Sequence, residues 1–196
     1  MTRLSWIVVL SAGLLASNAA EARPAATPLP GNSVYQLQAT LTDASGRPRN
    51  WAEFRGKPRI ATMFYGSCPY MCPLIIESGK AIDRSLTPAE RARLGVVMVS
   101  LDPKRDSPAA LTALINKRGI DPKRWTLLRP QPKDVRSLAA VLGIKYRALA
   151  DGEFNHTSVL VLLDAEGRIL ARTETIGTKP DPEFLNAVRK ALAPRK

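Results

Sequence analysis

Two cysteines, the only ones in the chain, lie four positions apart in the stretch Phe64-Tyr65-Gly66-Ser67-Cys68-Pro69-Tyr70-Met71-Cys72-Pro73. Residues at this spacing lie one above the other on a helix, so the sulfurs of Cys68 and Cys72 converge if both stand at or just before the first helical turn. A helix N-terminus carries partial positive charge and free N–H groups, which favour thiolates over thiols. Two converging thiolates can close a disulfide or bind a soft metal ion.

If the chain is exported, a purely structural disulfide is the plainest interpretation of its two cysteines. A bridge between residues four apart closes a very small loop, however, and removes little entropy from the unfolded chain. The spacing of Cys68 and Cys72 therefore favours chemistry over stabilisation.

His156 is the only histidine of the chain, in the stretch Phe154-Asn155-His156-Thr157-Ser158. An isolated histidine is more often a structural or surface residue, but in an α/β fold whose central strand leads into the cysteine turn, the loop before the next-to-last strand can face that turn. We therefore expect His156 to approach Cys68 and Cys72. Two thiolates and an imidazole form a trigonal site that suits Cu(I), with Cu(II) and Zn(II) as chemical alternatives. In a redox alternative, one thiolate attacks, the other resolves, and the histidine tunes the thiolate or shuttles protons.

Hydrophobic periodicity predicts strands and helices in alternation, followed by an antiparallel hairpin and a last helix. The predicted strands are Val34–Thr42, Arg59–Tyr65, Gly95–Leu101 and Trp125–Leu128, and the hairpin joins Ser158–Asp164 to Arg168–Thr173. One helix is predicted over Val135–Leu142, and the others begin after Cys72, Thr87, Ser107 and Asp181. This order predicts an α/β, thioredoxin-like fold: a central mixed sheet flanked by helices, with an N-terminal strand or hairpin extension. The cysteines then lie at the carboxyl edge of the sheet, where α/β folds place their sites.

The N-terminus predicts the compartment of the protein. A basic start, an apolar run from Leu4 to Ala16 and the small residues around Ala20-Glu21-Ala22 are typical of a secretory signal peptide over residues 1–22. The alternative of a retained membrane anchor needs a longer apolar run. Residues 23–32 are a proline-rich linker, and residues 33–196 form one domain. We expect an exported, periplasmic and soluble protein.

The formal net charge of +12 raises nucleic-acid binding as a first interpretation. The Lys and Arg residues are scattered along the chain, without a basic run or a nucleic-acid motif, so we expect no nucleic-acid partner. The charge instead favours peripheral contact with an anionic membrane surface or an acidic protein partner. We expect a monomer.

Three stretches resemble the SCO/SenC family of copper-handling proteins. They are Cys68-Pro69-Tyr70-Met71-Cys72-Pro73, Val99-Ser100-Leu101-Asp102-Pro103-Lys104-Arg105-Asp106-Ser107-Pro108 and Asn155-His156-Thr157-Ser158, and the resemblance extends from Val34 to the C-terminus. It implies a thioredoxin-like fold, copper bound by Cys68, Cys72 and His156 as Cu(I) or Cu(II), and a role in assembling the CuA centre of cytochrome c oxidase. The implied partner is the oxidase subunit with the CuA site, or another copper acceptor.

The chain departs from the family pattern at two points. Asn155 stands where the family commonly has Asp before the distal histidine, which removes an anionic partner for the imidazole. Pro69-Tyr70-Met71 separates the cysteines where many members carry an acidic residue. Asp102 and Asp106 fall in a loop that the resemblance places near the site, but their positions also suit a turn and a helix cap.

The family also contains members that look more like thiol–disulfide reductases than metal carriers. As an enzyme, this protein would use Cys68 and Cys72 as a redox-active pair to reduce the cysteines of a copper acceptor. A peroxiredoxin-like peroxidase fits less well, because Tyr65 stands where such enzymes have a threonine three residues before the reactive cysteine. We expect a metallochaperone, with the reductase as its rival.

Overall fold

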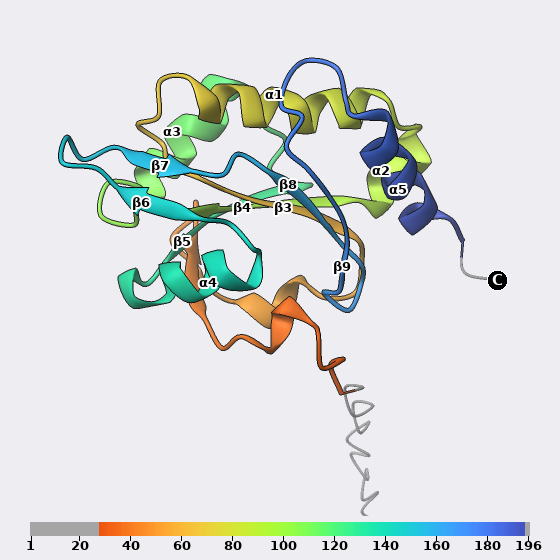
Figure 1. Ribbon diagram of the computed structural model, residues 1–196, viewed down its shortest axis with the longest axis horizontal. Coiled ribbons are helices and arrows are strands. Elements are labelled where there is room, and N and C mark those ends of the chain that lie inside the picture. The colour runs from red at the N-terminus through yellow and green to blue at the C-terminus, as the bar shows by residue number, and fades with distance from the viewer. Residues whose placement is uncertain (1–27, 195–196) are drawn as a thin grey trace, which may run out of the picture.

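The computed structural model describes residues 28–194, which form a layered α/β domain around a mixed seven-stranded sheet (Figure 1). The strands follow one another in the order β2-β1-β5-β4-β3-β8-β9. Their bounds are β1 Thr40–Asp43, β2 Pro48–Asn50, β3 Arg59–Phe64, β4 Gly95–Ser100, β5 Trp125–Pro130, β8 Leu160–Leu163 and β9 Ile169–Thr173. β3, β4 and β5 are parallel neighbours, and all other pairings in this sheet are antiparallel.

Helices cover both faces of the sheet. Figure 1 shows α1 and α3 above the sheet and α4 below it. The helices are α1 Met71–Arg84, α2 Pro88–Arg93, α3 Pro108–Arg118, α4 Val135–Val141 and α5 Pro182–Leu192, with short 3-10 helices at Val34–Gln36, Trp51–Phe54 and Pro132–Asp134. Proline stands at the start of α2, α3 and α5, where its missing N–H costs nothing.

The central strands β3 and β4 are buried because helices lie on both of their faces. Every residue of β4 is buried, as is every residue of β3 after Arg59, which explains their continuous apolar sequences. β3 and β4 pair in register from Arg59 with Gly95 to Phe64 with Ser100. Both strands therefore end at the same edge of the sheet, and the residues that follow them lie side by side there.

The structure confirms most predicted elements and corrects the N-terminal strand. Residues Val34–Gln36 form a 3-10 helix, and the strand starts only at Thr40. The Ser33 hydroxyl accepts the Tyr35 N–H and so begins this helix. The expected N-terminal extension is present as the antiparallel pair β1 and β2, added to the sheet beside β5.

The predictions missed a second, two-stranded sheet, formed by β6 Tyr146–Ala148 and β7 Phe154–His156. The predicted signal peptide at residues 1–22 and part of the predicted linker lie outside the described residues. Among residues 28–194, no helix has both the length and the apolar character that crossing a membrane requires.

Candidate metal centre

Both cysteines lie where the central strand β3 passes into helix α1. Cys68 stands in the connecting turn, closed by a hydrogen bond from its N–H to the carbonyl oxygen of Tyr65, and Cys72 is the second residue of the helix. Tyr70, at the N-cap of α1, offers no side-chain cap. The Cys68 sulfur takes that role instead and accepts the Cys72 N–H at 3.4 Å. The predicted placement at the entrance of a helix is confirmed.

The environment of Cys68 favours its thiolate. Burial alone raises the pKa of this thiol, but hydrogen bonds outweigh that effect and bring the pKa below its ordinary value. The donors are the backbone N–H groups of Cys72, at 3.4 Å, and of Tyr70. Donors directed at a sulfur stabilise its charged form, as the helix N-terminus does. Cys68 is therefore prepared to act as a nucleophile or a metal ligand.

Cys72 has the opposite character. Only 3% of this residue is exposed, and burial raises the pKa of its thiol, with a further contribution from the negative charge of Cys68. Its sulfur accepts the Tyr65 N–H at 3.4 Å. Both cysteines are free thiols. Cys72 thus needs a neighbouring cation or an electrophilic sulfur before it gives up its proton.

His156 is the last residue of β7, in the small hairpin outside the main sheet. Tyr146 pairs with His156 across this hairpin, and the ring of His156 lies edge-on to Tyr65 with the ring centroids 5.8 Å apart. The Nδ1 atom lies 3.2 Å from the carbonyl oxygen of Thr157. A carbonyl only accepts, so Nδ1 carries the proton and the lone pair is on Nε2. Burial lowers the pKa of His156, which keeps the ring neutral and able to bind a metal.

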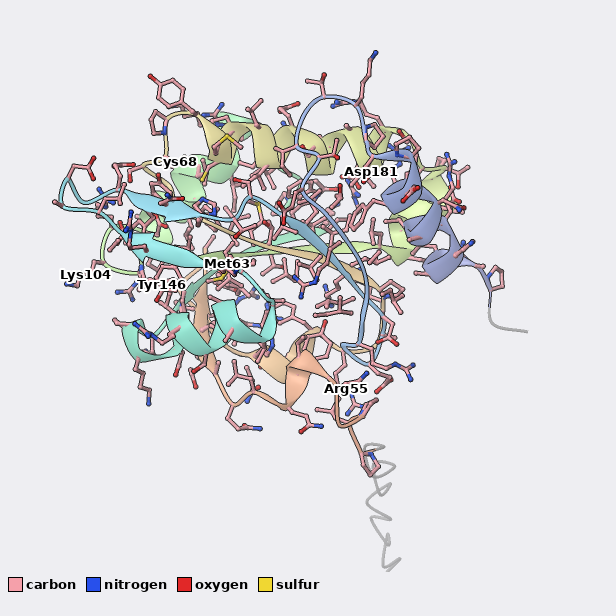
Figure 2. All side chains as sticks on the ribbon, viewed as in Figure 1. Arg55, Met63, Cys68, Lys104, Tyr146 and Asp181 are labelled. Carbon is pink, nitrogen blue, oxygen red and sulfur yellow. The ribbon has the colours of Figure 1, made fainter. Side chains whose placement is uncertain are left out.

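One cavity joins the cysteine turn to the hairpin. It has a volume of about 430 Å³, and Cys68, Tyr70, Met71, Glu153 and His156 are among the residues that line it. Figure 2 shows Cys68 between the start of α1 and this hairpin. Cys72 is not part of the lining, and its N–H donates to the sulfur of Cys68.

The structure therefore brings His156 to the cavity that Cys68 lines, although the two residues are 88 positions apart in the sequence. Within residues 28–194, no three His, Cys, Asp or Glu side chains are grouped closely enough to hold a metal ion. The chemistry of the donors suits a soft cation all the same: one sulfur with a lowered pKa, a second sulfur beside it and a neutral imidazole.

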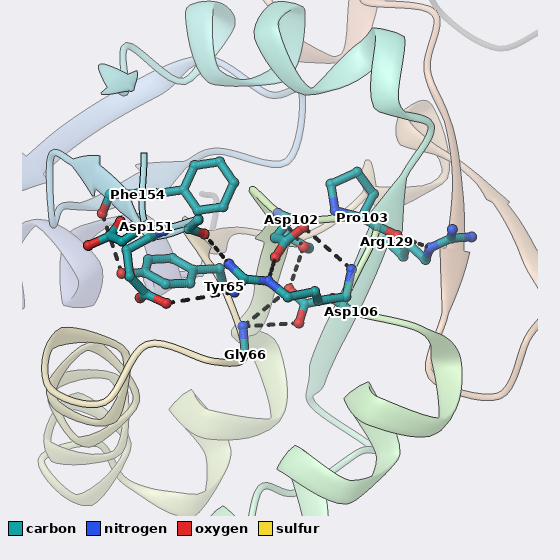
Figure 3. A network of polar contacts seen from close by, with 12 residues as sticks. Tyr65, Gly66, Asp102, Pro103, Asp106, Arg129, Asp151 and Phe154 are labelled. Carbon is teal, nitrogen blue, oxygen red and sulfur yellow. Dashed lines mark hydrogen bonds and ion pairs between the residues drawn. The ribbon is translucent and has the colours of Figure 1, made fainter. Parts of the chain in front are cut away.

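The loop after β4 supports the cysteine turn from the neighbouring strand (Figure 3). The Asp106 carboxylate accepts the Gly66 N–H at 3.0 and 3.2 Å and the Ser100 hydroxyl at 2.5 Å. Burial raises the pKa of Asp106 although these hydrogen bonds act against it. The helix cap of α3 is Ser107 and not Asp106. Asp106 instead fixes the turn that leads to Cys68.

Sequence reasoning missed two residues of this site, Tyr65 and Glu153. Tyr65 contacts three parts of it: its N–H donates to the Cys72 sulfur, its ring packs on Phe154 and His156, and its hydroxyl donates to the Phe154 carbonyl oxygen at 3.4 Å. The available signal was its place directly before the cysteine turn. Glu153 lines the cavity, but its distance from the cysteines in sequence gave no signal.

Comparison with known proteins gives a family match over most of the chain. The family model described as SCO1/SenC matches residues 30–193. A protein of Stutzerimonas stutzeri whose name describes it as copper-binding is 21% identical over 136 residues. The match covers 67% of this chain, and this chain spans 65% of the length of that relative.

Solved structures of the same family share the fold. A SCO1/SenC family lipoprotein from Bacillus anthracis strain Ames is 21% identical, with a TM-score of 0.71, over 80% of this chain and 95% of that one. ScoI of Bradyrhizobium japonicum, solved with copper bound, is 22% identical, with a TM-score of 0.60, over 79% and 98% of the two chains. BsSco is 17% identical, with a TM-score of 0.68, over 81% and 94%. It is described as a member of the Sco family of cytochrome c oxidase assembly proteins with a disulfide switch. The predicted thioredoxin-like class is confirmed.

Proposed function

This chain belongs to the SCO1/SenC family, and we propose that it is an exported copper metallochaperone that holds one copper ion on Cys68, Cys72 and His156. The observation that carries the proposal is the shared cavity, which is lined both by the sulfur of lowest pKa and by the only imidazole of the chain. Two proteins similar to this chain support the choice of metal: ScoI was solved with copper bound, and the relative from Stutzerimonas stutzeri is named as copper-binding.

Cu(I) is the form that these donors suit best, because thiolates are soft ligands. Cys68 binds first, since its pKa is already lowered and its sulfur faces the cavity. Cys72 loses its proton when the cation lies beside it, because a positive charge offsets the burial that raises its pKa. His156 completes a trigonal site through Nε2 when the hairpin closes on the sulfurs. Cu(II) is held by the same donors after oxidation.

The acceptor that we propose is the cytochrome c oxidase subunit with the CuA site, or another copper acceptor. BsSco, of the same fold, is described within a family of oxidase assembly proteins. Transfer runs by ligand exchange, in which the acceptor's thiolates and imidazoles replace those of this chain one at a time. A protein that delivers copper to an exported oxidase domain must itself be exported. This requirement agrees with the signal peptide expected over residues 1–22.

The test is a Cu(I) titration of the reduced protein against a chromophoric chelator, without oxygen. Three variants are compared with the wild type: Cys68→Ala, Cys72→Ala and His156→Ala. We expect one tightly bound ion per chain, lost in either cysteine variant and held more weakly without His156. Ser67→Ala is the matched control, because Ser67 lies in the same turn, is exposed and has no role in the proposed site.

Two results would contradict the proposal. If the reduced wild type holds no copper, the chain is not a copper carrier. If His156→Ala binds as tightly as the wild type, the imidazole is not a ligand and the site consists of the two sulfurs alone.

A second function, thiol–disulfide reduction of a copper acceptor, is favoured by the difference between the two cysteines. Cys68 lines the cavity and its pKa is lowered, whereas Cys72 is buried outside the lining and its pKa is raised. The Cys68 thiolate would attack the acceptor's disulfide and release one acceptor thiolate, leaving a mixed disulfide. Cys72 would then attack Cys68, so that this chain becomes oxidised and the acceptor's second thiolate is released.

A trapping experiment separates this function from copper binding. Cys72→Ser should accumulate a mixed disulfide at Cys68 when it is mixed with an oxidised CuA domain, because the resolving thiol is gone. Cys68→Ser is the control and should trap none. If neither variant forms the mixed disulfide while the wild type binds copper, the reductase function is excluded.

A further inference from the structure

Arg105 connects the two halves of the site across a gap that no other described ion pair crosses within residues 28–194. Its Nε donates to the Asp102 carboxylate in the loop after β4. Its terminal nitrogens reach the hairpin: one donates to the Gly152 carbonyl oxygen, and the other lies 3.7 Å from the Glu153 carboxylate. One guanidinium therefore joins the loop after β4 to the turn of the β6–β7 hairpin.

The loop end of this connection is itself fixed to the cysteine turn. The Ser100 hydroxyl donates to Asp106 and accepts the Asp102 N–H at 2.9 Å. Asp106 in turn accepts the Gly66 N–H, two residues before Cys68. Figure 3 shows this chain of contacts around Gly66, Asp102 and Asp106. A group that Arg105 binds is therefore held in place relative to the cysteine turn as well as to the loop.

The hairpin end needs such an anchor. β6 and β7 form a sheet of their own, with three residue pairs and no strand of the main sheet beside them. The turn is closed by a hydrogen bond from the Leu149 N–H to the Glu153 carbonyl oxygen at 2.8 Å. Two residues near the cysteine turn contact this hairpin: Tyr65 packs its ring on Phe154 and donates its hydroxyl to the Phe154 carbonyl oxygen, and Arg105 contacts the turn itself. His156 follows Glu153 by only three residues, so its position depends on the turn.

We propose that Arg105 is a positioning residue that sets the distance between His156 and the two sulfurs. The proposal rests on the copper function proposed above and assigns to the motif Asp102-Pro103-Lys104-Arg105-Asp106 a role in that site. Asn155 leaves no acidic side chain directly before the histidine. In this chain the hairpin is oriented from its turn, by the pair that Arg105 makes with Glu153 and the bond it donates to Gly152.

Arginine suits this role better than lysine does. The planar guanidinium presents several N–H donors in a fixed fork, so Asp102 can hold one edge while the other edge reaches the hairpin. Asp102 is buried and directs the Nε edge. A lysine ammonium is a single point of charge and cannot serve both sides in the same way.

The experiment is a double-mutant cycle on Cu(I) affinity, measured by chelator competition on the reduced protein. The four forms are the wild type, Arg105→Ala, His156→Ala and the double variant. We expect Arg105→Ala to lower the affinity about 10-fold, as the loss of outer partners of metal ligands does. In the His156→Ala background the same change should have no further effect, because the residue that Arg105 positions is already gone.

Two further variants keep the test decisive. Arg105→Lys should lose less copper affinity than Arg105→Ala, and only when His156 is present. If Arg105→Ala does not fold, Arg105→Lys takes its place in the cycle. Arg129→Ala is the matched control: its guanidinium donates to the Pro103 carbonyl oxygen of the same loop but not to the hairpin. We expect its affinity to stay within about 2-fold of the wild type, as for substitutions away from a site.

The outcomes separate this inference from the proposed function. Equal losses on removing Arg105 with and without His156 would show a general structural role and overturn the positioning role. Unchanged affinity in Arg105→Ala, with tight binding by the wild type, would also overturn it and leave the copper function standing. A wild type that holds no copper would overturn both.

Discussion

In the proposed site, the cysteine turn and the β6–β7 hairpin would supply the two kinds of donor, and the structure holds these two segments in different ways. The cysteine turn continues β3, which pairs with β4 on one side and β8 on the other and is buried throughout after Arg59. The hairpin is a separate sheet of two three-residue strands, half-buried to exposed. Segments with few buried contacts are those that open most readily.

The difference suggests how one site can both hold and release an ion. The two sulfurs are organised before copper arrives, so little ordering is left to oppose binding. In the proposed site the imidazole lies on the less anchored element, so we expect it to leave the copper ion first when an acceptor approaches. We therefore expect retention of copper to depend on the main sheet and its exchange to depend on the hairpin.

The largest expected effect comes from breaking the cysteine turn. Cys72→Ser should lower Cu(I) affinity by more than the roughly 100-fold that marks the upper range for outer partners, because a ligand itself is lost. Chelator competition measures it. A loss smaller than that of His156→Ala would reverse the comparison, since the hairpin would then be the principal holder of copper.

The next effect concerns stability. A Cβ on Gly66 would lie 2.5 Å from Asp106 Oδ1, so Gly66→Ala must displace the carboxylate that holds the turn. We expect a loss of about 1–3 kcal/mol in the free energy of unfolding, the usual cost of overpacking, measured by urea denaturation. Gly31→Ala is the control, because nothing lies within 4 Å of its added Cβ. Equal stability of both variants would show that the turn is not held through Asp106.

A smaller effect tests the hairpin through pH. The pKa of His156 is lowered by burial from its ordinary value of 6.5, so protons compete with copper only below that value. At neutral pH the wild type should bind copper more tightly than His156→Ala does. This difference in affinity should persist at pH 6.5 and vanish in more acidic solution. Acid weakens copper binding by the cysteines equally in both proteins, so the ratio of their affinities reports the contribution of the imidazole alone. A ratio already lost at neutral pH would contradict the assignment.

The smallest effect is expected at the contact between the two regions. Tyr65→Phe removes the hydroxyl that donates to the Phe154 carbonyl oxygen at 3.4 Å but keeps the ring against Phe154 and His156. A long hydrogen bond contributes at most about 0.5–1.5 kcal/mol, so copper affinity should fall by only a few-fold in chelator competition. Tyr65→Ala is the comparison and should cost more, because the ring is lost as well.

The cysteine turn could be predicted from the sequence because its determinants are local. A continuous apolar strand, two cysteines four positions apart and a following helical pattern indicate where the sulfurs lie. The capping box at Thr87 and Glu90 and the Ser107 cap were equally readable, since each motif is complete within four residues. The strands β3 and β4 and the hairpin of β8 and β9 could also be predicted, because each shows its apolar pattern within a short stretch of sequence.

The hairpin with His156 could not be predicted in the same way. Three-residue strands are too short to show a period of two, and Tyr146–Ala148 and Phe154–His156 carry exposed as well as half-buried residues. Their pairing is stabilised by contacts with Tyr65 and Arg105, which are distant in sequence. The approach of His156 to the cysteine turn was expected from topology alone, and Val34–Gln36 was assigned to a strand because a single helical turn has no period to read.

X-ray absorption at the copper edge tests most directly whether the two regions bind one ion together. The reduced wild type, loaded with one Cu(I), is compared with His156→Ala loaded in the same way. We predict two sulfur neighbours and one nitrogen neighbour in the wild type, and two sulfurs without that nitrogen in the variant. Identical spectra with sulfur neighbours alone would show that copper rests on the cysteine turn and that the hairpin takes no part in binding.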